Sequence, residues 1–448
     1  MTPYDAHPYT SMAYSETHPD RLEFAAHLLG LGPAPAPPAR CRVLEVGCAG
    51  GGNLIPIAEL NPDSEVVGID LSATQIDEAR VAAATLGLGN LELRHQDLVD
   101  FRDDRRFDYI IAHGVYSWVP PAVSAALLDL VARNLAPGGV ALVSHYTKPG
   151  WYSRMLARET MLWHAHTVEP DDRVAQGRAF LELVARWARP DPMRDVLQVE
   201  LKGLRGQPDW LVRHEHLGDF SHACTFGELH AEIERRGLAY LGDAELGTMV
   251  PHDLAPEAQT ALAELAPDLP RREELLDLLR FRTMRMTLLC RAEARIDRAL
   301  STRRLAAAHL SAQVAPAAER EETRTALRRL TAAWPATLPF EELPAEAGRD
   351  LLQLVTLGLV RAQLSPARCV GSAGERPMAA PHARLAAGRP GLVPNLRHDN
   401  VKMGEPARRL LQRLDGTRDR AALEAELGGE MDVAHLLGEL AAKGLLLA

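Results

Sequence analysis

Aromatic residues and cysteines are scarce in this chain of 448 residues. Aromatic side chains make up 5% of the sequence, and the five cysteines lie far apart without C-x-x-C spacing. An odd number of isolated cysteines favours neither a disulfide framework nor a zinc site. We find no uninterrupted apolar run of about 18 residues, so we expect no membrane span. The net charge of −10 gives DNA or RNA no general electrostatic attraction, so a nucleic-acid partner is not expected.

The N-terminal segment also lacks the features of a secretory signal. The stretch "MTPYDAHPYT" has no basic residues followed by an apolar core, so we expect a cytoplasmic protein. The hydrophobic content of 46% and the charged content of 25% are ordinary for a globular protein. The length suggests roughly three domains of about 150 residues each. The oligomeric state is not defined by the sequence.

Strand-like and helix-like segments alternate after a Pro-rich connector, "GPAPAPPAR". Such a βαβ rhythm predicts an α/β fold with a doubly wound parallel sheet, whose ligand lies beyond the carboxyl ends of the strands. We expect strands at 41–47, 65–70, 91–97, 106–114 and 140–146, and helices at 53–61, 72–88 and 120–139.

Further along the chain, the patterns predict a completed sheet and then helices. Residues 151–195 look helical, and strands at 210–217 and 238–246 would flank a helix at 226–237. Residues 254 to about 315 look strongly helical. The expected division is an N-terminal lid segment (1–36), a catalytic domain (37–253), a helical connector (254–315) and a winged-helix-like α+β domain (316–448).

That C-terminal domain is predicted from an internal repeat. Residues 337–362 resemble residues 417–448, with about five extra residues in the second copy. Each copy reads as a capped helix, a second helix of the form LLxxLxxxGL and a short strand, which is the outline of a winged-helix half. Two unrelated helical hairpins remain an alternative.

The stretch "VLEVGCAGGGN" places a glycine-rich turn directly after the first expected strand. A phosphate-binding P-loop would need Gly-Lys-Ser/Thr, and a dinucleotide site would need G-x-G-x-x-G. The turn matches neither, but it fits E-x-G-x-[GA]-x-G through Glu45, Gly47, Ala49 and Gly51. A carboxylate before the first glycine would repel a pyrophosphate and attract the α-ammonium of S-adenosylmethionine.

Two further acidic residues end expected strands. Asp70 lies nineteen residues after Gly51, where an acid that binds ribose hydroxyls is expected. Leu71 would then pack on the adenine, and Asp97 would accept a hydrogen bond from the adenine amino group. Taken alone, Asp97 reads better as a helix N-cap.

With these motifs in place, the sequence resembles class I S-adenosylmethionine-dependent methyltransferases. The resemblance extends through "YDAHPYTSMAYSETHPDRL", "FDYIIAHGVYSWVP", "TKPGWYSRMLARETMLWH", "FRTMRMTLLCRAE" and "NLRHDNVKM" to nearly the whole chain. It is to a bacterial family with a methyltransferase regulatory domain, which includes lysine methyltransferases acting on outer-membrane proteins. The chain departs from that family at Ala49, where glycine is usual, and at 214–230, where a Tyr and an Asn-x-Pro are missing.

These arguments define an expected cofactor site for S-adenosylmethionine and an expected acceptor site. The cofactor contacts predicted are Glu45, Gly47, Cys48, Gly51, Asn53, Asp70, Leu71, Gln75, Asp97, Leu98 and His113. The catalytic candidates are Tyr9, Tyr14, His113, Tyr116, Trp118 and Tyr146.

Aromatic residues supply most of the acceptor site. Tyr116, Trp118, Tyr146, Trp151 and Tyr152 would form a wall that receives an alkylammonium by cation–π attraction. Tyr4, Tyr9 and Tyr14 precede the sheet, and their spacing of five fits neither a helix face nor a strand. We expect a lid there, although a core role is possible. His113 and His145 are candidate bases, each with a structural alternative.

Other chemistry is not favoured. The pairs His164/His166 and His214/His216 have no carboxylate or cysteine at ligand spacing, so no metal site is predicted. The [DN]PP[YFW] and Pro-Cys motifs of DNA-base methyltransferases are missing from 113–120.

Three functions remain open. N-methylation of a protein or peptide, with lysine favoured by the resemblance, comes first. Methylation of a ribosomal peptide or small natural product is second, because residues 392–448 look like modules that bind leader peptides by adding a strand. A non-catalytic cofactor sensor or DNA-binding regulator is third.

Overall fold

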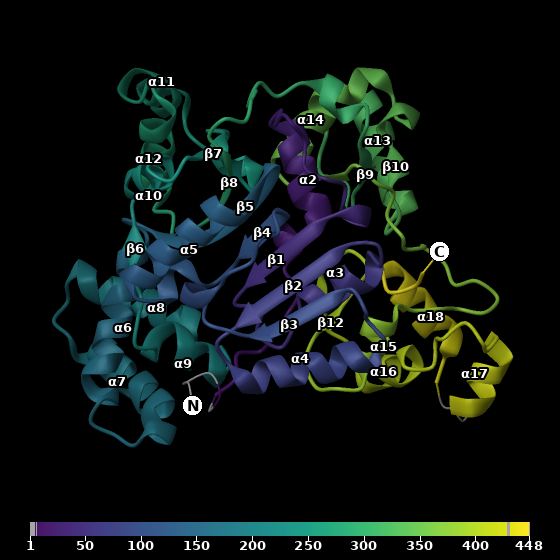
Figure 1. Ribbon diagram of the computed structural model, residues 1–448, viewed down its shortest axis with the longest axis horizontal. Helices are drawn as coiled ribbons and strands as arrows, with labels where there is room; N and C mark the ends of the chain where they lie inside the picture. The colour runs from purple at the N-terminus through teal and green to yellow at the C-terminus, as the bar shows by residue number, and fades with distance from the viewer. Residues whose placement is uncertain (1–4, 6, 428–430, 448) are drawn as a thin grey trace.

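A mixed β-sheet forms the centre of the molecule (Figure 1). The computed structural model describes residues 5, 7–427 and 431–447. The main sheet has the strand order β3-β2-β1-β4-β5-β8-β7, and β6 pairs with β5. Its strands are β1 (Arg42–Val46), β2 (Glu65–Asp70), β3 (Leu91–His95), β4 (Phe107–Ala112), β5 (Leu135–Thr147), β6 (Ala223–Cys224), β7 (Leu238–Asp243) and β8 (Met284–Arg291).

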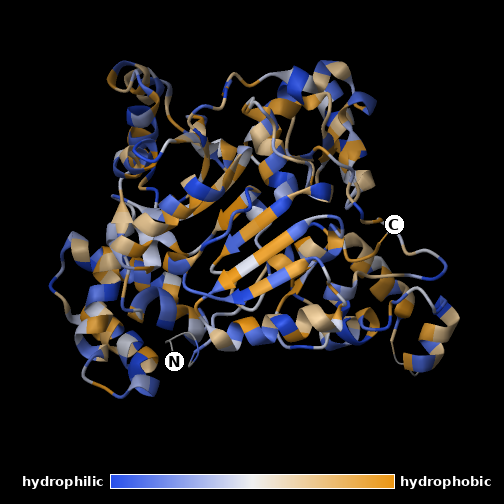
Figure 2. Cartoon of the chain, in the orientation of Figure 1, coloured by the Kyte–Doolittle hydropathy of each residue, from blue (hydrophilic) through white to orange (hydrophobic). Residues whose placement is uncertain are grey.

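The first five strands are parallel to one another, as the sequence predicts. Four of the five residues of β1 are buried, which is typical of a parallel strand covered on both faces. Figure 2 shows these central strands as largely hydrophobic. The Rossmann-like fold class is therefore confirmed.

Helices cover both faces of the sheet, so it is doubly wound. One core contains Leu22, Leu54 and Ile76 from α2, α3 and α4. The other contains Leu127 and Leu229 from α5 and α10. The bounds are α2 (Pro19–Leu28), α3 (Leu54–Leu60), α4 (Ala73–Thr85), α5 (Pro121–Asn134) and α10 (Phe226–Glu234).

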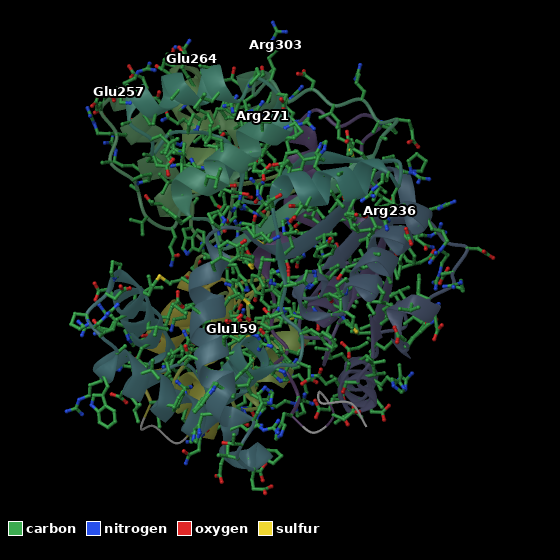
Figure 3. The ribbon with its side chains drawn as sticks, turned by 90° about the vertical axis from the view of Figure 1, so that its left-hand side faces the viewer. Glu159, Arg236, Glu257, Glu264, Arg271 and Arg303 are labelled. Atoms are coloured by element: carbon green, nitrogen blue, oxygen red, sulfur yellow. The ribbon has the colours of Figure 1, made fainter. Side chains whose placement is uncertain are left out.

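Strand β8 corrects the expectation of a helical region at 254–315. Helices α11 (Pro256–Leu265) and α12 (Leu269–Arg280) are present, but 284–291 is a strand antiparallel to both β5 and β7. In "MRMTLLCR" every second residue is apolar, and the Arg- and Leu-rich helices before it hide this period of two. Glu257 and Glu264 of α11 lie at the rim of the molecule in Figure 3, so this helix belongs to an outer layer.

A buried arginine joins α12 to the sheet. Arg285 of β8 is fully buried; its Nε donates to Asp277 Oδ2 at 2.8 Å and its Nη1 to Glu273 Oε2 at 3.0 Å. Its guanidinium also lies 4.5 Å from the centroid of the Phe226 ring. This pairing satisfies a charge that would be costly to bury alone.

A helical layer follows β5 and includes a second correction. Its helices are α6 (Trp151–Ala165), α7 (Arg173–Trp187), α8 (Pro192–Leu204) and α9 (Asp209–Leu217), with a shared core. Residues 210–217 were expected as a strand but form α9. In "WLVRHEHL" the alternation of histidines suggests a strand, whereas Val212 and His216, four residues apart, are the buried face of a helix.

The C-terminal part consists of two halves, each with its own core. The first half contains β9 (His309–Ser311), α13 (Glu321–Ala333), β10 (Leu338–Pro339), α14 (Gly348–Thr356) and β11 (Arg361–Gln363). The second contains α15 (Pro381–Ala387), β12 (Val393–Pro394), β13 (Asn400–Val401), α16 (Glu405–Leu411), α17 (Arg420–Leu427) and α18 (Val433–Ala442). Figure 1 shows the halves at separate corners beside the sheet.

The repeat is only partly regular. The second copy has both expected helices, α17 and α18, whereas 340–347 of the first copy forms two short 3-10 turns instead of a capped helix. Pro344 lies between those turns and interrupts helical hydrogen bonding. Within the described residues, none of the helices is long and apolar enough to cross a membrane.

Candidate active site

The glycine-rich turn lies between the carboxyl end of β1 and α3. Gly47, Ala49 and Gly51 have φ angles of 76°, 47° and 75°, a region that favours glycine. A Cβ at Gly47 would lie 2.7 Å from Val115 Cγ2. The turn is therefore rich in glycine because its backbone bends tightly and packs against the residues that follow β4.

Glu45 is buried at the end of β1. Its Oε1 accepts a 2.9 Å hydrogen bond from Asn53 Nδ2, while its buried Oε2 has no hydrogen-bond partner within the described residues. Burial raises the pKa of Glu45 to about 8, although the hydrogen bond from Asn53 opposes this rise. An unsatisfied buried carboxylate oxygen fits the α-ammonium of S-adenosylmethionine, which would pair with it.

Asp70 ends β2 and closes the turn from the other side. Its Oδ2 accepts from the Ala49 amide at 2.8 Å, and its Oδ1 accepts from the Ser72 amide at 2.8 Å. Burial raises the pKa of this carboxyl despite those two bonds. Leu71 beside it is 46% exposed, so its side chain is available to a ligand.

The other predicted cofactor contacts lie in differing environments. Asp97 accepts from the Val99 amide at 3.0 Å and caps a 3-10 helix. Leu98 packs against the sheet core, and the side chain of Cys48 lies in the opposite core. Gln75 Nε2 donates to the Tyr9 carbonyl at 2.7 Å. Roles for Asp97, Leu98, Cys48 and Gln75 in cofactor binding stay predictions.

The N-terminal segment crosses the glycine-rich turn. The Gly52 amide donates to Ser11 Oγ at 2.7 Å, and the Tyr14 amide donates to Asn53 Oδ1 at 3.0 Å. The Tyr14 ring lies 4.4 Å from the His113 ring at the end of β4. A lid remains the function we predict for this segment; Tyr4 lies outside the described residues.

Asn53 connects three parts of the chain. Besides Glu45 and Tyr14, it contacts Thr17 Oγ1, and its Oδ1 lies 2.6 Å from Nε2 of His398 in the C-terminal half. The ring of His398 also packs 4.8 Å from that of His18. The sequence analysis includes His398 in the stretch "NLRHDNVKM" but gives it no role, because nothing local marks a contact between residues 345 positions apart.

An aromatic cluster lies beside the ends of β4 and β5. The Tyr146 and Trp151 rings stack with centroids 3.3 Å apart, and Trp118 meets Tyr146 edge-on at 5.2 Å. Two residues expected in this wall lie elsewhere. Tyr152 is 57% exposed, and Tyr116 packs in the sheet core near His145 and His222.

The two histidines predicted as bases differ in position. His145 is buried in the sheet, with Nε2 at 3.1 Å from Thr287 Oγ1, and burial lowers its pKa to about 3. We therefore interpret His145 as a structural residue. Burial lowers the pKa of His113 to about 4, but its buried Nδ1 has no hydrogen-bond partner in the described chain. His113 is therefore a neutral ring that packs against Tyr14.

Glu215 of α9 is an acidic residue at the aromatic cluster that sequence reasoning missed. Besides burial, its charge helps to raise the pKa of Tyr9, Tyr14 and Tyr146, so its carboxylate acts electrostatically on all three. Arg154 Nη1 is its ion-pair partner at a long 4.0 Å. Sequence reasoning assigned 210–217 to a strand and gave Glu215 no role, since nothing local marks its contact with Arg154 of α6.

The histidine pairs do not meet acidic ligands. His214 and His216 lie on α9, and His214 Nε2 contacts the His7 carbonyl at 2.9 Å. No group of three His, Cys, Asp or Glu side chains arranged to hold a metal ion is found among residues 5, 7–427 and 431–447.

Comparisons with known families match this arrangement in three segments. Residues 43–139 match the family described as a methyltransferase domain, and residues 208–291 a predicted methyltransferase regulatory domain. Residues 375–444 match the family described as the PKMT C-terminal winged helix domain. The chain belongs to the class I S-adenosylmethionine-dependent methyltransferases, in the group that combines these three modules. Its cofactor is S-adenosylmethionine.

Two relatives come from Rickettsia prowazekii. The uncharacterized protein RP789 is 38% identical over 301 residues, 66% of this chain and 54% of that protein. The chain thus spans about half the length of that relative. The uncharacterized protein RP028 is 31% identical over 237 residues, 52% of this chain and 94% of that protein.

A solved structure shares the whole fold. PKMT2 from Rickettsia typhi in complex with AdoHcy has a TM-score of 0.87 and 23% identity, covering 98% of this chain and 100% of that one. This likeness confirms the sheet, the helical layer and the winged-helix part as one architecture.

Proposed function

We propose that this protein transfers methyl groups to lysine side chains of a protein substrate. The observation that carries the proposal is the aromatic cluster of Trp118, Tyr146 and Trp151 with the Glu215 carboxylate beside it. Aromatic faces and a carboxylate together attract an alkylammonium group. A carboxylate acceptor would be repelled by the charge of Glu215. A hydroxyl acceptor has no positive charge for Glu215 to attract.

Tyr14 connects this acceptor site to the cofactor site. Besides burial, the charges of both Glu45 and Glu215 raise the pKa of Tyr14, so both carboxylates act on its hydroxyl. Bound S-adenosylmethionine supplies an electrophilic methyl group on its sulfonium. The aromatic rings and the N-terminal segment would align the amine with it and exclude water.

The acceptor amine must lose a proton before it attacks. Burial raises the pKa of Glu215, while Arg154 opposes this rise. A carboxyl with a raised pKa is better matched to accept a proton from an ammonium group than an ordinary glutamate. We assign Glu215 the role of holding the ammonium and receiving its proton, while His113 orients Tyr14.

The winged-helix part would hold the protein substrate. Strands β12 and β13 form a sheet of two strands, to whose edge an extended polypeptide can add a strand with little demand on sequence. Short lysine peptides should then be poorer acceptors than the full-length protein. Methylation of a ribosomal peptide remains the second candidate, because it uses the same edge.

Mass mapping of lysines tests the proposal. Candidate outer-membrane proteins are incubated with S-adenosylmethionine and this protein, digested, and analysed for peptides that gain one, two or three methyl groups. Modified lysines support the proposal. Methyl groups found only on carboxylates or hydroxyls would overturn the assignment of the acceptor. Tight binding of S-adenosylhomocysteine without transfer to any protein or peptide would favour the non-catalytic alternative.

A further inference from the structure

A strongly basic cavity lies away from the active-site residues, between the first domain and the C-terminal halves. It has a volume of about 70 Å³ and is lined by α2, by the end of α3 and by segments 361–368 and 396–397. Roughly 10–15 Å³ measured in this way is enough for one water molecule. The cavity therefore has room for several waters or for one small ion.

Four arginines line this cavity: Arg21, Arg361, Arg368 and Arg397. Three of them are held in place by the protein. Arg361 forms a bidentate pair with Asp399 at 2.7 and 2.8 Å, and Arg397 Nη2 donates to Ser311 Oγ at 2.6 Å. Arg368 donates to the Leu60 carbonyl at the end of α3.

Arg21 of α2 differs from the other three. Within the described chain its guanidinium makes no hydrogen bond or ion pair with a side chain, although it lines the cavity. Burial lowers the pKa of Arg21, and the neighbouring charge of Arg361 lowers it further. A cation that is half-buried, repelled and without a partner lacks a counter-charge.

The acidic groups near the cavity do not supply it. Asp20 lies 3.6 Å from His18 Nδ1, and Asp399 is already engaged by Arg361. Glu16 and these two aspartates act on Arg21 only through longer-range attraction. Burial lowers the pKa of His18, which favours the neutral ring. Of these carboxylates, only Asp20 lines the cavity together with the four arginines, and Asp399 is paired with Arg361.

We propose that this cavity binds a small, multiply charged oxyanion of the inorganic phosphate type. Guanidinium groups converging from several elements are the arrangement that recognises phosphate oxygens. The enclosed volume favours a free ion over a phosphate group attached to a large molecule. Arg21 would supply the charge-assisted hydrogen bonds for which it has no protein acceptor.

Such an ion would join the C-terminal halves to the cofactor domain. Arg361, Arg368 and Arg397 belong to the C-terminal part, whereas Arg21 and Leu60 belong to the first domain. Arg397 precedes His398, whose Nε2 contacts Asn53 beside Glu45. Binding at the cavity would therefore stabilise the contact that positions the cofactor turn.

Calorimetric titration of the full chain with inorganic phosphate tests the proposal, with chloride at matched ionic strength as the reference. Saturable binding of phosphate is expected, accompanied by a higher Tm. Arg21→Gln should weaken phosphate binding at least tenfold, since a factor of ten corresponds to one charge-assisted hydrogen bond. In the absence of phosphate, this variant should be as stable as the wild type or more stable, because it removes a repelled cation.

Two controls keep the test decisive. Arg40→Gln changes an exposed arginine next to the cavity wall and should leave phosphate binding unchanged. Arg368→Gln should weaken phosphate binding as Arg21→Gln does, and it replaces Arg21→Gln in the test if that variant fails to fold.

Phosphoserine should bind less tightly than inorganic phosphate. Absence of saturable phosphate binding, or equal binding by wild type and both cavity variants, would overturn the proposal. Lysine methylation is not involved in any of these measurements.

Discussion

Single buried carboxylates determine what the cofactor turn can bind. Glu45 has one oxygen bonded to Asn53 and one buried oxygen without a partner in the described residues. Asp70 accepts two backbone amides and so fixes the shape of the turn. The sequence predicts both residues because their spacing from the glycines is local information.

The variant Glu45→Gln should have a higher stability at alkaline pH but a lower affinity for S-adenosylmethionine. Because the pKa of Glu45 is raised to about 8 by burial, the folded cofactor-free state binds more protons than the unfolded state between about pH 4.5 and 8. The stability of the wild type therefore falls as pH rises through this window. Glu45→Gln should be more stable than the wild type at pH 9, by roughly 1–3 kcal/mol.

Denaturant unfolding at pH 5 and pH 9 measures this difference, and calorimetry measures the loss of S-adenosylmethionine affinity in the same variant. The stability gain should largely disappear at pH 5, where the wild-type carboxyl is protonated. A gain of equal size at both pH values would contradict the assigned pKa.

Asp70→Ala should weaken S-adenosylhomocysteine binding by about 2 kcal/mol or more, since the hydroxyls of the ribose would lose a charged acceptor. Calorimetric titration gives the affinity. Asp77→Ala is the matched control, because Asp77 is an acid of the following helix whose side chain is exposed and pairs with Arg80. If the two variants bind equally well, Asp70 does not hold the ribose.

Among the elements, the sequence predicts the parallel strands and the helices between them. Their apolar runs and turn residues are sufficient signals. It fails for α9 and β8, where histidines or arginines interrupt the apolar pattern. It also misses Glu215 and His398, because their partners come from distant elements. Tertiary packing, not local propensity, places these residues.

The turn itself can be tested at Ala49. A residue with a Cβ at φ 47° costs roughly 1–2 kcal/mol relative to its ordinary conformations. Ala49→Gly should therefore raise the free energy of unfolding by about 1 kcal/mol, as measured by urea denaturation. Gly47→Ala is the opposite control, since its Cβ would meet Val115 Cγ2 at 2.7 Å, and it should destabilise the protein. Destabilisation by Ala49→Gly would argue against the left-handed conformation.

The N-terminal segment divides into two parts with different roles. Thr17 is fully buried and contacts Asn53, so removal of residues 1–18 would open the core. Removal of residues 1–10 takes away Tyr9 but keeps Ser11 and Tyr14. We expect this shorter truncation to unfold cooperatively, like the full chain, but to turn over slowly, because the lid over the acceptor site is incomplete. Undiminished turnover would contradict a lid role for Tyr9.

On the scale of the whole molecule, the C-terminal part touches the cofactor domain directly. Glu59 of α3 accepts from the His382 amide at 2.6 Å, and Asn400 Nδ2 donates to the Ala13 carbonyl at 2.7 Å. These contacts surround the glycine-rich turn and the start of the N-terminal segment. Residues 316–448 therefore help to position the cofactor domain, in addition to the substrate-binding role that we propose for them.

The central claim is that Glu215 and the aromatic cluster receive the acceptor ammonium next to the cofactor turn. The single-turnover rate constant of Glu215→Gln, on the acceptor found by mass mapping, tests this claim. Glu159→Gln is the control, because Glu159 lies exposed on α6 (Figure 3). We predict that the rate of Glu215→Gln falls at least tenfold while its S-adenosylhomocysteine affinity stays unchanged, and that Glu159→Gln behaves as the wild type. A Glu215→Gln variant that transfers methyl groups at the wild-type rate would contradict the account.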